Sequence, residues 1–216
     1  MGKPVVTSGS AQARPRLVET VAMQRREAVA LAIEDAALDL LAARRMADVT
    51  VEEIAAHAGV AVRTLYRYFP TKEHVFAGLP RRGAEQLAEL LDARPATEGP
   101  FEALRNATIE MGAALDTVEL ARWLKALANS DANERIVRVA YSASTSALVQ
   151  ALSERAGLGV DDLWPAMAGT MAAGALIVGT KHWARTRGDL LEQLLAALDI
   201  VGKGLSSFDA VEAAQV

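Results

Sequence analysis

Two short helices separated by a glycine are predicted by the segment TVEEIAAHAGVAVRTLYRYFP. Thr50 is followed three residues later by Glu53, a spacing typical of a capping box, in which each side chain accepts a hydrogen bond from the other residue's amide. Gly59 ends the first helix, because glycine tolerates the left-handed backbone conformation there. Pro70 stops the second helix, which is expected over about residues 62–68. Two short helices joined by a tight glycine-containing turn are typical of a helix-turn-helix.

A helix is predicted on each side of this pair. Val29, Ile33, an alanine and Leu40 recur at three- and four-residue steps, which indicates an amphipathic helix over about residues 25–44. A further helix is expected to follow the pair over about residues 72–91. The first three helices together are sufficient for a small three-helix unit with its own apolar centre.

The chain divides into three parts on this pattern. Residues 1–24 contain glycine, serine and proline without a sustained period and are expected to be a disordered or frayed tail. Residues 25–72 are expected to form the helix-turn-helix domain, and residues 73–216 a second, larger domain. Further helices are expected in that second domain over about residues 99–115, 117–129, 132–156, 161–186 and 188–206. Because the sequence lacks strand alternation, the predicted fold class is all-α with about nine helices.

The composition supports a helical, cytoplasmic protein. Alanine and leucine are prominent, and cysteine is absent, which excludes a disulfide framework and a thiolate metal site. The N-terminal residues lack the continuous apolar run of a secretory signal. Residues 163–180 carry no charge, but their small-residue composition and Pro165 favour a buried helix over a membrane span. We therefore expect no membrane segment.

The helix-turn-helix predicts contact with double-stranded DNA. The second helix of this motif enters the major groove, where its early residues meet base edges. Arg63 can form two hydrogen bonds to a guanine, and Thr64 or Val62 can touch a thymine methyl group. The net charge of the whole chain is −4, so DNA has to be met by a local basic patch. The predicted DNA-contacting residues are Thr50, Ala61, Val62, Arg63, Thr64, Tyr66, Arg67, Tyr68 and Lys72. For Tyr66 and Tyr68, packing within the small domain is an alternative or additional role. Arg14 and Arg16 can reach DNA as an arm, although a solvated tail is the simpler interpretation.

The segment VTVEEIAAHAGVAVRTLYRYFPTKEHVFAGL resembles the N-terminal DNA-binding domain of the TetR family of bacterial repressors. The resemblance covers about residues 25–80 and implies an all-helical homodimer with a divergent C-terminal domain for ligand and dimer contacts. It places Thr50, Arg63, Thr64, Tyr66, Tyr68 and Lys72 at the usual DNA-contacting positions. Ala61 departs from the pattern, because many members have a serine or threonine there that caps the recognition helix.

The C-terminal part more loosely resembles the mycofactocin-associated regulators, through RWLKALANSD, LWPAMAG and HW. That resemblance implies a small apolar effector, such as an acyl-CoA. Methionine and tryptophan suit an adaptable apolar pocket, although ordinary core packing is the alternative for each residue. The expected ligand-binding residues are Phe101, Met111, Arg122, Trp123, Tyr141, Trp164, Met167, Met171, His182 and Trp183.

The last two predicted helices are expected to form the dimer interface. Small residues permit close approach of a second helix, and the leucine stripe is too wide for the surface of a monomer. A two-fold dimer implies a palindromic operator. The expected interface residues are Gly169, Ala172, Ala173, Gly179, Leu190, Leu191, Leu194, Leu195, Leu198 and Val201.

Two other classes of protein are alternatives to a DNA-binding regulator. A helical enzyme acting on acyl substrates is one, and a helical adaptor that binds protein is the other. The three histidines lack metal-ligand spacing, and the sequence has no G-x-S-x-G, no HExxH and no phosphate-binding glycine loop. We therefore expect no catalytic residues, no metal and no cofactor.

Overall fold

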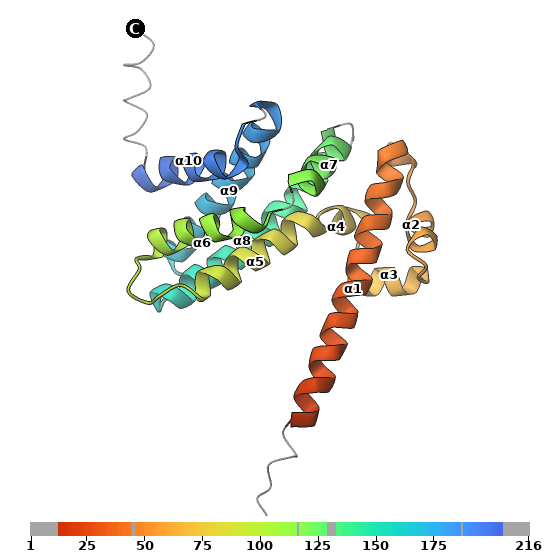
Figure 1. The fold of residues 1–216 in the computed structure, drawn as a ribbon, viewed down its shortest axis with the longest axis horizontal. Helices are drawn as coiled ribbons and strands as arrows, with labels where there is room; N and C mark the ends of the chain where they lie inside the picture. The colour runs from red at the N-terminus through yellow and green to blue at the C-terminus, as the bar shows by residue number, and fades with distance from the viewer. Residues whose placement is uncertain (1–12, 45, 116, 129–132, 187, 205–216) are drawn as a thin grey trace, which may run out of the picture.

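The computed structural model describes residues 13–44, 46–115, 117–128, 133–186 and 188–204 (Figure 1). Within these residues the chain forms ten α-helices, one short 3-10 helix and no strand, which confirms the all-α prediction. The elements are α1 (Ala13–Ala43), η1 (Met46–Asp48), α2 (Val51–His57), α3 (Val62–Tyr68), α4 (Lys72–Phe76), α5 (Gly78–Asp92), α6 (Pro100–Ala114), α7 (Thr117–Ala128), α8 (Asn133–Ala156), α9 (Leu163–Thr186) and α10 (Leu190–Lys203).

The helices α1, α2 and α3 form a small unit, called the head below. Ile33, Ile54 and Leu65 are fully buried at its centre, and Phe69 is 4% exposed beside them. The predicted capping box is present at the start of α2, and Gly59 ends that helix with a φ of 67°. Figure 1 shows α2 and α3 on the side of α1 that faces away from α5 to α10.

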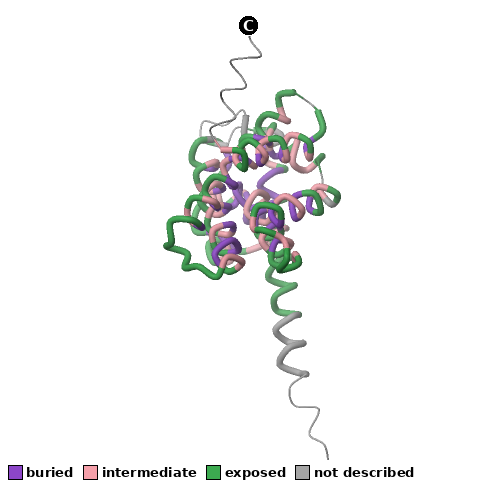
Figure 2. Tube along the Cα trace, turned by 90° about the vertical axis from the view of Figure 1, so that its left-hand side faces the viewer, coloured by how far each residue is buried: buried purple, intermediate pink, exposed green. Residues whose placement is uncertain are grey.

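Helix α1 begins at Ala13, twelve residues before the expected start at residue 25. Residues 21–28 of α1 are exposed and project from the rest of the molecule (Figure 2). Residues 21–28 are all exposed, so they carry no buried apolar stripe, and a search for helical periodicity does not detect this part. Residues 1–12 lie outside the described residues, and so do the side chains of Arg14 and Arg16.

The predicted helix over residues 72–91 is divided into α4 and α5 at Ala77. Pro80 explains the break, because it has no amide hydrogen to donate to the carbonyl of Phe76 four residues earlier. That carbonyl instead accepts a hydrogen bond of 2.6 Å from the indole Nε1 of Trp123 in α7. The donor missing from the local helix is therefore supplied by a side chain of α7, a helix that is distant in the sequence.

The helices α5, α6, α8, α9 and α10 form a second unit, called the body below. Their shared core includes Leu87, Leu148 and Leu198. Helices α8 and α9 approach closely at a glycine: a Cβ at Gly169 would lie 2.7 Å from the backbone nitrogen of Val149 in α8. Figure 2 marks the buried positions of these helices in purple.

Helix α9 passes a simple test for membrane spans. By length and composition alone, it is the one helix among the described residues that is long and apolar enough to cross a bilayer. Buried core helices pass the same test. Helix α9 packs against α8 and α10, with Gly169 and Ala173 buried in those contacts, which favours the core-helix interpretation.

Candidate nucleic-acid interface

The surface of α3 that faces solvent is polar and basic. Leu65 anchors the helix in the head, where it is completely buried. Arg63, Tyr66 and Arg67 are exposed on the other faces of this two-turn helix, and Tyr66 is 49% exposed despite its large apolar ring. Thr64 is half-buried. The helix therefore offers these hydrogen-bond donors to a DNA groove. The core of the head is packed without them.

The start of α3 has no side-chain cap. Ala61 occupies the N-cap position with an extended backbone, φ −72° and ψ 146°, and its methyl group cannot accept a hydrogen bond. Its carbonyl accepts from the amides of Thr64 and Leu65, so the helix still begins there. Ala61 is exposed, and the half-buried Val62 packs against the core of the head.

Replacing Ala61 by serine is expected to raise the free energy of unfolding by about 1 kcal/mol, because a serine hydroxyl accepts from an amide in the first turn of the helix. Thermal unfolding followed by circular dichroism measures this change. Ala61→Val serves as the control, since it adds volume at the same exposed position without an acceptor. Equal stability of the serine and valine variants would contradict the expected cap.

Thr50 and Lys72 are brought together at the start of α2. The ammonium of Lys72 donates a hydrogen bond of 2.8 Å to the carbonyl of Val49, the residue before Thr50. The Thr50 hydroxyl accepts from the amide of Glu53 at 3.2 Å and lies 3.1 Å from its carboxylate. The hydrogen bond from the Thr50 amide, together with the ion pair to Arg44, lowers the pKa of Glu53 to about 2. The hydroxyl expected to meet a phosphate is thus already engaged in the capping box.

Tyr68 contacts two arginines at the end of α3. The guanidinium carbon of Arg67 is 5.3 Å from the centre of its ring, and that of Arg26 in α1 is 5.9 Å away. Sequence reasoning missed Arg26 and its neighbour Arg25, because they were placed at the very edge of the predicted helix. The signal was present in the spacing, since Arg26 and Arg25 lie three and four residues before Val29, which packs on the head.

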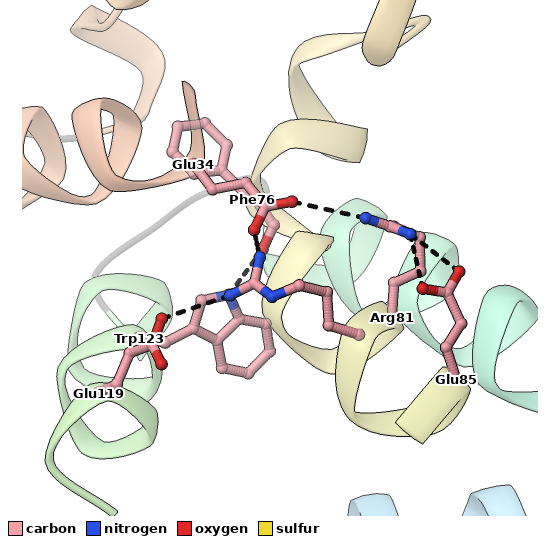
Figure 3. A network of polar contacts seen from close by, with 7 residues as sticks. Glu34, Phe76, Arg81, Glu85, Glu119 and Trp123 are labelled. Carbon is pink, nitrogen blue, oxygen red and sulfur yellow. Dashed lines mark hydrogen bonds and ion pairs between the residues drawn. The ribbon is translucent and has the colours of Figure 1, made fainter. Parts of the chain in front are cut away.

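The head is joined to the body by a buried ion pair. Glu34 of α1 is 4% exposed and pairs with Arg82 of α5. Arg82 also contacts Glu119 of α7 at 3.4 Å, while Arg81 lies 3.7 Å from Glu34 and 2.8 Å from Glu85. Burial lowers the pKa of Arg82, and surrounding carboxylates act in the opposite direction, so the guanidinium keeps its charge. Figure 3 shows how the carboxylate and its partners converge between the helices.

Gly78 makes room for this ion pair at the start of α5. A Cβ atom built on Gly78 would clash with the carboxylate of Glu34. The absence of a side chain therefore lets the charged group of α1 reach the backbone of α5. A second ion pair joins α1 to α7, where the exposed Arg122 pairs with Asp39.

The ten residues expected around a ligand cavity lie in separate surroundings. Trp123 belongs to the core that the head shares with α7 and α8, whereas Met111 belongs to the core of the body. Trp164, Met167 and Met171 are exposed on α9. The remaining five have other contacts: Phe101 lies against Gly202, Arg122 pairs with Asp39, Tyr141 donates to the carbonyl of Thr170, Trp183 donates to that of Gly188, and His182 is exposed.

The residues expected at the dimer interface are mainly used within the chain. The following are buried against α8, α10 or the body core: Gly169, Ala172, Ala173, Gly179, Leu190, Leu194 and Leu198. Leu191, Leu195 and Val201 are half-buried. Periodicity shows that a residue belongs to an apolar face, but it does not show which neighbour covers that face.

A different face of α9 carries exposed apolar side chains. Trp164, Met167, Met171 and Val178 are 44%, 53%, 39% and 62% exposed and recur at three-, four- and seven-residue steps. Such steps place them along one side of the helix. This set is called the α9 apolar face below. Exposed apolar side chains that gather on one side of a helix are typical of interaction surfaces.

Comparison with known proteins identifies both parts of the chain. Residues 33–79 match the family model for bacterial regulatory proteins of the tetR family, and residues 98–206 match that of the MftR C-terminal domain. A Mycobacterium tuberculosis protein described as the mycofactocin biosynthesis transcriptional regulator MftR is 28% identical over 185 residues, which are 84% of this chain and 93% of that protein.

Solved structures share the fold. A TetR transcriptional regulator from Rhodococcus sp. RHA1 aligns with a TM-score of 0.52 at 20% identity, over 85% of this chain and 99% of that one. Thermus thermophilus FadR, a TetR-family transcriptional repressor in complex with lauroyl-CoA, aligns with a TM-score of 0.51 at 23% identity, over 82% of this chain and 94% of that one.

Proposed function

Because the chain belongs to the TetR family of bacterial regulatory proteins, we propose that it is a transcriptional repressor that binds a palindromic operator as a homodimer. The observation that carries the proposal is the exposed surface of α3, where Arg63, Tyr66 and Arg67 point away from a head that is packed without them. The family relationship favours this function over an acyl-substrate enzyme or a protein-binding adaptor. It also favours action in the cytoplasm, where the operator is accessible.

We assign different roles to the residues of this interface. Arg63 lies in the first turn of α3 and is proposed to read a base edge. Tyr66 and Tyr68 are proposed to contact phosphates together with Lys72, which lies beside Thr50. We propose that residues 25–72 form the DNA-binding domain and residues 73–216 the ligand-binding and dimerisation domain, with α4 also contributing Val75 and Phe76 to the core of the head.

Substituting Arg63 by alanine is expected to reduce operator affinity by about 1–3 kcal/mol and to relax the preference for one base, because a bidentate contact to guanine is lost. Tyr66→Phe is expected to weaken binding to all sequences alike, since a phosphate contact carries no sequence information. Fluorescence anisotropy with operator DNA and with single-base variants measures both effects. DNA from upstream of the protein's own gene is the first operator to test, across a series of salt concentrations.

The control for these substitutions is Lys125→Ala, an exposed change on α7. Absence of DNA binding by the unmodified protein, or binding that is insensitive to salt, would contradict the proposed function. Operator binding that tolerates the loss of both Arg63 and the Tyr66 hydroxyl would place the DNA contact outside α3.

The proposed effector is a small apolar molecule of the acyl-CoA type. The MftR-like C-terminal domain and the fold shared with a lauroyl-CoA-bound repressor support this choice. Differential affinity for two arrangements of the heads is what allows an effector to release DNA. We expect lauroyl-CoA to lower the fraction of DNA bound in a titration, with coenzyme A and free laurate as controls. An unchanged bound fraction at saturating lauroyl-CoA would exclude this acyl-CoA as the effector.

The dimer is proposed to form through the α9 apolar face. Trp164, Met167 and Met171 are therefore reassigned from the ligand pocket to the interface, because they are exposed on one side of a helix. The glycines and leucines of α9 and α10 hold the body together and keep this face in position.

A further inference from the structure

An open groove lies between α1 and the end of α3. It has a volume of about 810 Å³ and lies on the head, next to the surface of α3. The residues that line it are Val21, Ala22, Arg25, Arg26, Val29, Arg67 and Tyr68. Arg67 and Tyr68 belong both to α3 and to the groove, so the two surfaces are continuous.

The groove is basic although the chain is acidic. Three of its lining residues are arginines and none is a carboxylate. Within the described part of the chain, no ion pair joins Arg25, Arg26 or Arg67 to an acidic group. The two guanidiniums over the ring of Tyr68 gain from cation–π contact but repel each other. An anion in the groove would offset that repulsion.

The helical period of α1 directs these arginines to one side. Val29, three or four residues after them, is partly buried against the head, and Ile33, four residues further on, is fully buried. Arg25 and Arg26 therefore lie on the same face of α1 as Val29 and Ile33. They lie beside the C-terminal end of α3. Glu27, which lies between Arg26 and Val29 in the sequence, acts to raise the pKa of Arg82 in α5 by charge attraction, opposite to the effect of burial. Its carboxylate therefore acts on the body.

We propose that this groove holds a phosphodiester segment of DNA adjoining the bases that α3 reads, with Arg25 and Arg26 as phosphate-positioning residues. The proposal rests on the proposed function, since it assumes that α3 binds a duplex. The open shape suits a continuous polyanion that passes along the head. In Figure 1, α1 projects beyond α3, so this part of the helix can lie along the DNA backbone beside the bases that α3 reads.

The double variant R25A/R26A tests this proposal by fluorescence anisotropy on operator DNA across a salt series. Each phosphate contact contributes about 0.9 to the slope of log affinity against log salt concentration. We expect the slope of R25A/R26A to be smaller than that of the unmodified protein by about 1.8. The ranking of single-base operator variants should stay the same, because phosphate contacts position the protein without specifying sequence.

Two further variants separate this role from others. K125A/R138A removes the same two charges from exposed positions on α7 and α8, and it should leave the slope unchanged. R25K/R26K keeps both charges and should restore most of the slope. If R25A/R26A binds with unchanged slope and affinity, or if R25K/R26K fails to restore the slope, the groove assignment is overturned while operator binding by α3 stands. If the unmodified protein binds no operator, the proposed function itself fails.

Discussion

Replacing Arg82 by methionine is expected to lower the free energy of unfolding by about 3 kcal/mol, because it leaves the carboxylate of Glu34 buried without its main partner. Removing one member of a buried ion pair costs about 3–5 kcal/mol in general. The value here should lie at the lower end, since Arg81 remains 3.7 Å from Glu34. Urea unfolding at pH 7 and at a fixed protein concentration measures the change.

Matched variants distinguish the ion pair from general effects of arginine removal. Arg81→Ala removes a neighbouring arginine that is 37% exposed, and it should cost about 1 kcal/mol or less. Adding Glu34→Gln to Arg82→Met should recover part of the lost stability, because the unpaired charge is then gone. A loss below 1 kcal/mol in the Arg82 variant would show that the pair does not hold the head on the body.

Placing lysines at Met167 and Met171 is expected to convert the proposed dimer to a monomer. Both side chains lie in the α9 apolar face, and two ammonium groups on each copy would meet two more across a two-fold interface. Loss of the second reading head removes the advantage of simultaneous binding, so operator affinity should fall by about 10²–10⁴-fold. Light scattering measures the mass, and anisotropy measures the affinity.

The folded protomer should survive this change, since exposed substitutions alter stability by about 0.5 kcal/mol or less. The control is S142K/S146K, which adds the same charges to exposed positions of α8. A dimeric M167K/M171K variant would place the interface elsewhere on the molecule. A monomeric variant with full operator affinity would contradict the link between dimerisation and DNA binding.

The head was predictable from sequence because its signals are local. The capping box of Thr50 and Glu53, the glycine after α2 and the proline after α3 each act within a few residues. The break between α4 and α5 also had a local signal in Pro80. By contrast, the extension of α1 had none, because an exposed helix needs no apolar stripe.

The body residues were harder to assign because their roles depend on distant neighbours. Gly169 and Met167 are two residues apart on α9, yet one meets the backbone of α8 and the other meets solvent. Trp123 was expected near a ligand, but its indole donates to a carbonyl at the end of α4. Composition and spacing do not contain the tertiary partner of such residues, so the ligand and dimer residues proposed from sequence could not be distinguished.

The indole of Trp123 makes the bend after α4 depend on a helix that is remote in the sequence. The carbonyl of Phe76 cannot be satisfied by its own helix, because Pro80 offers no hydrogen there. Any displacement of α7 would therefore strip this carbonyl of its donor, at a cost comparable to that of an unmet buried hydrogen bond. The bend between α4 and α5 therefore depends in part on the position of α7, which supplies the donor that Pro80 lacks.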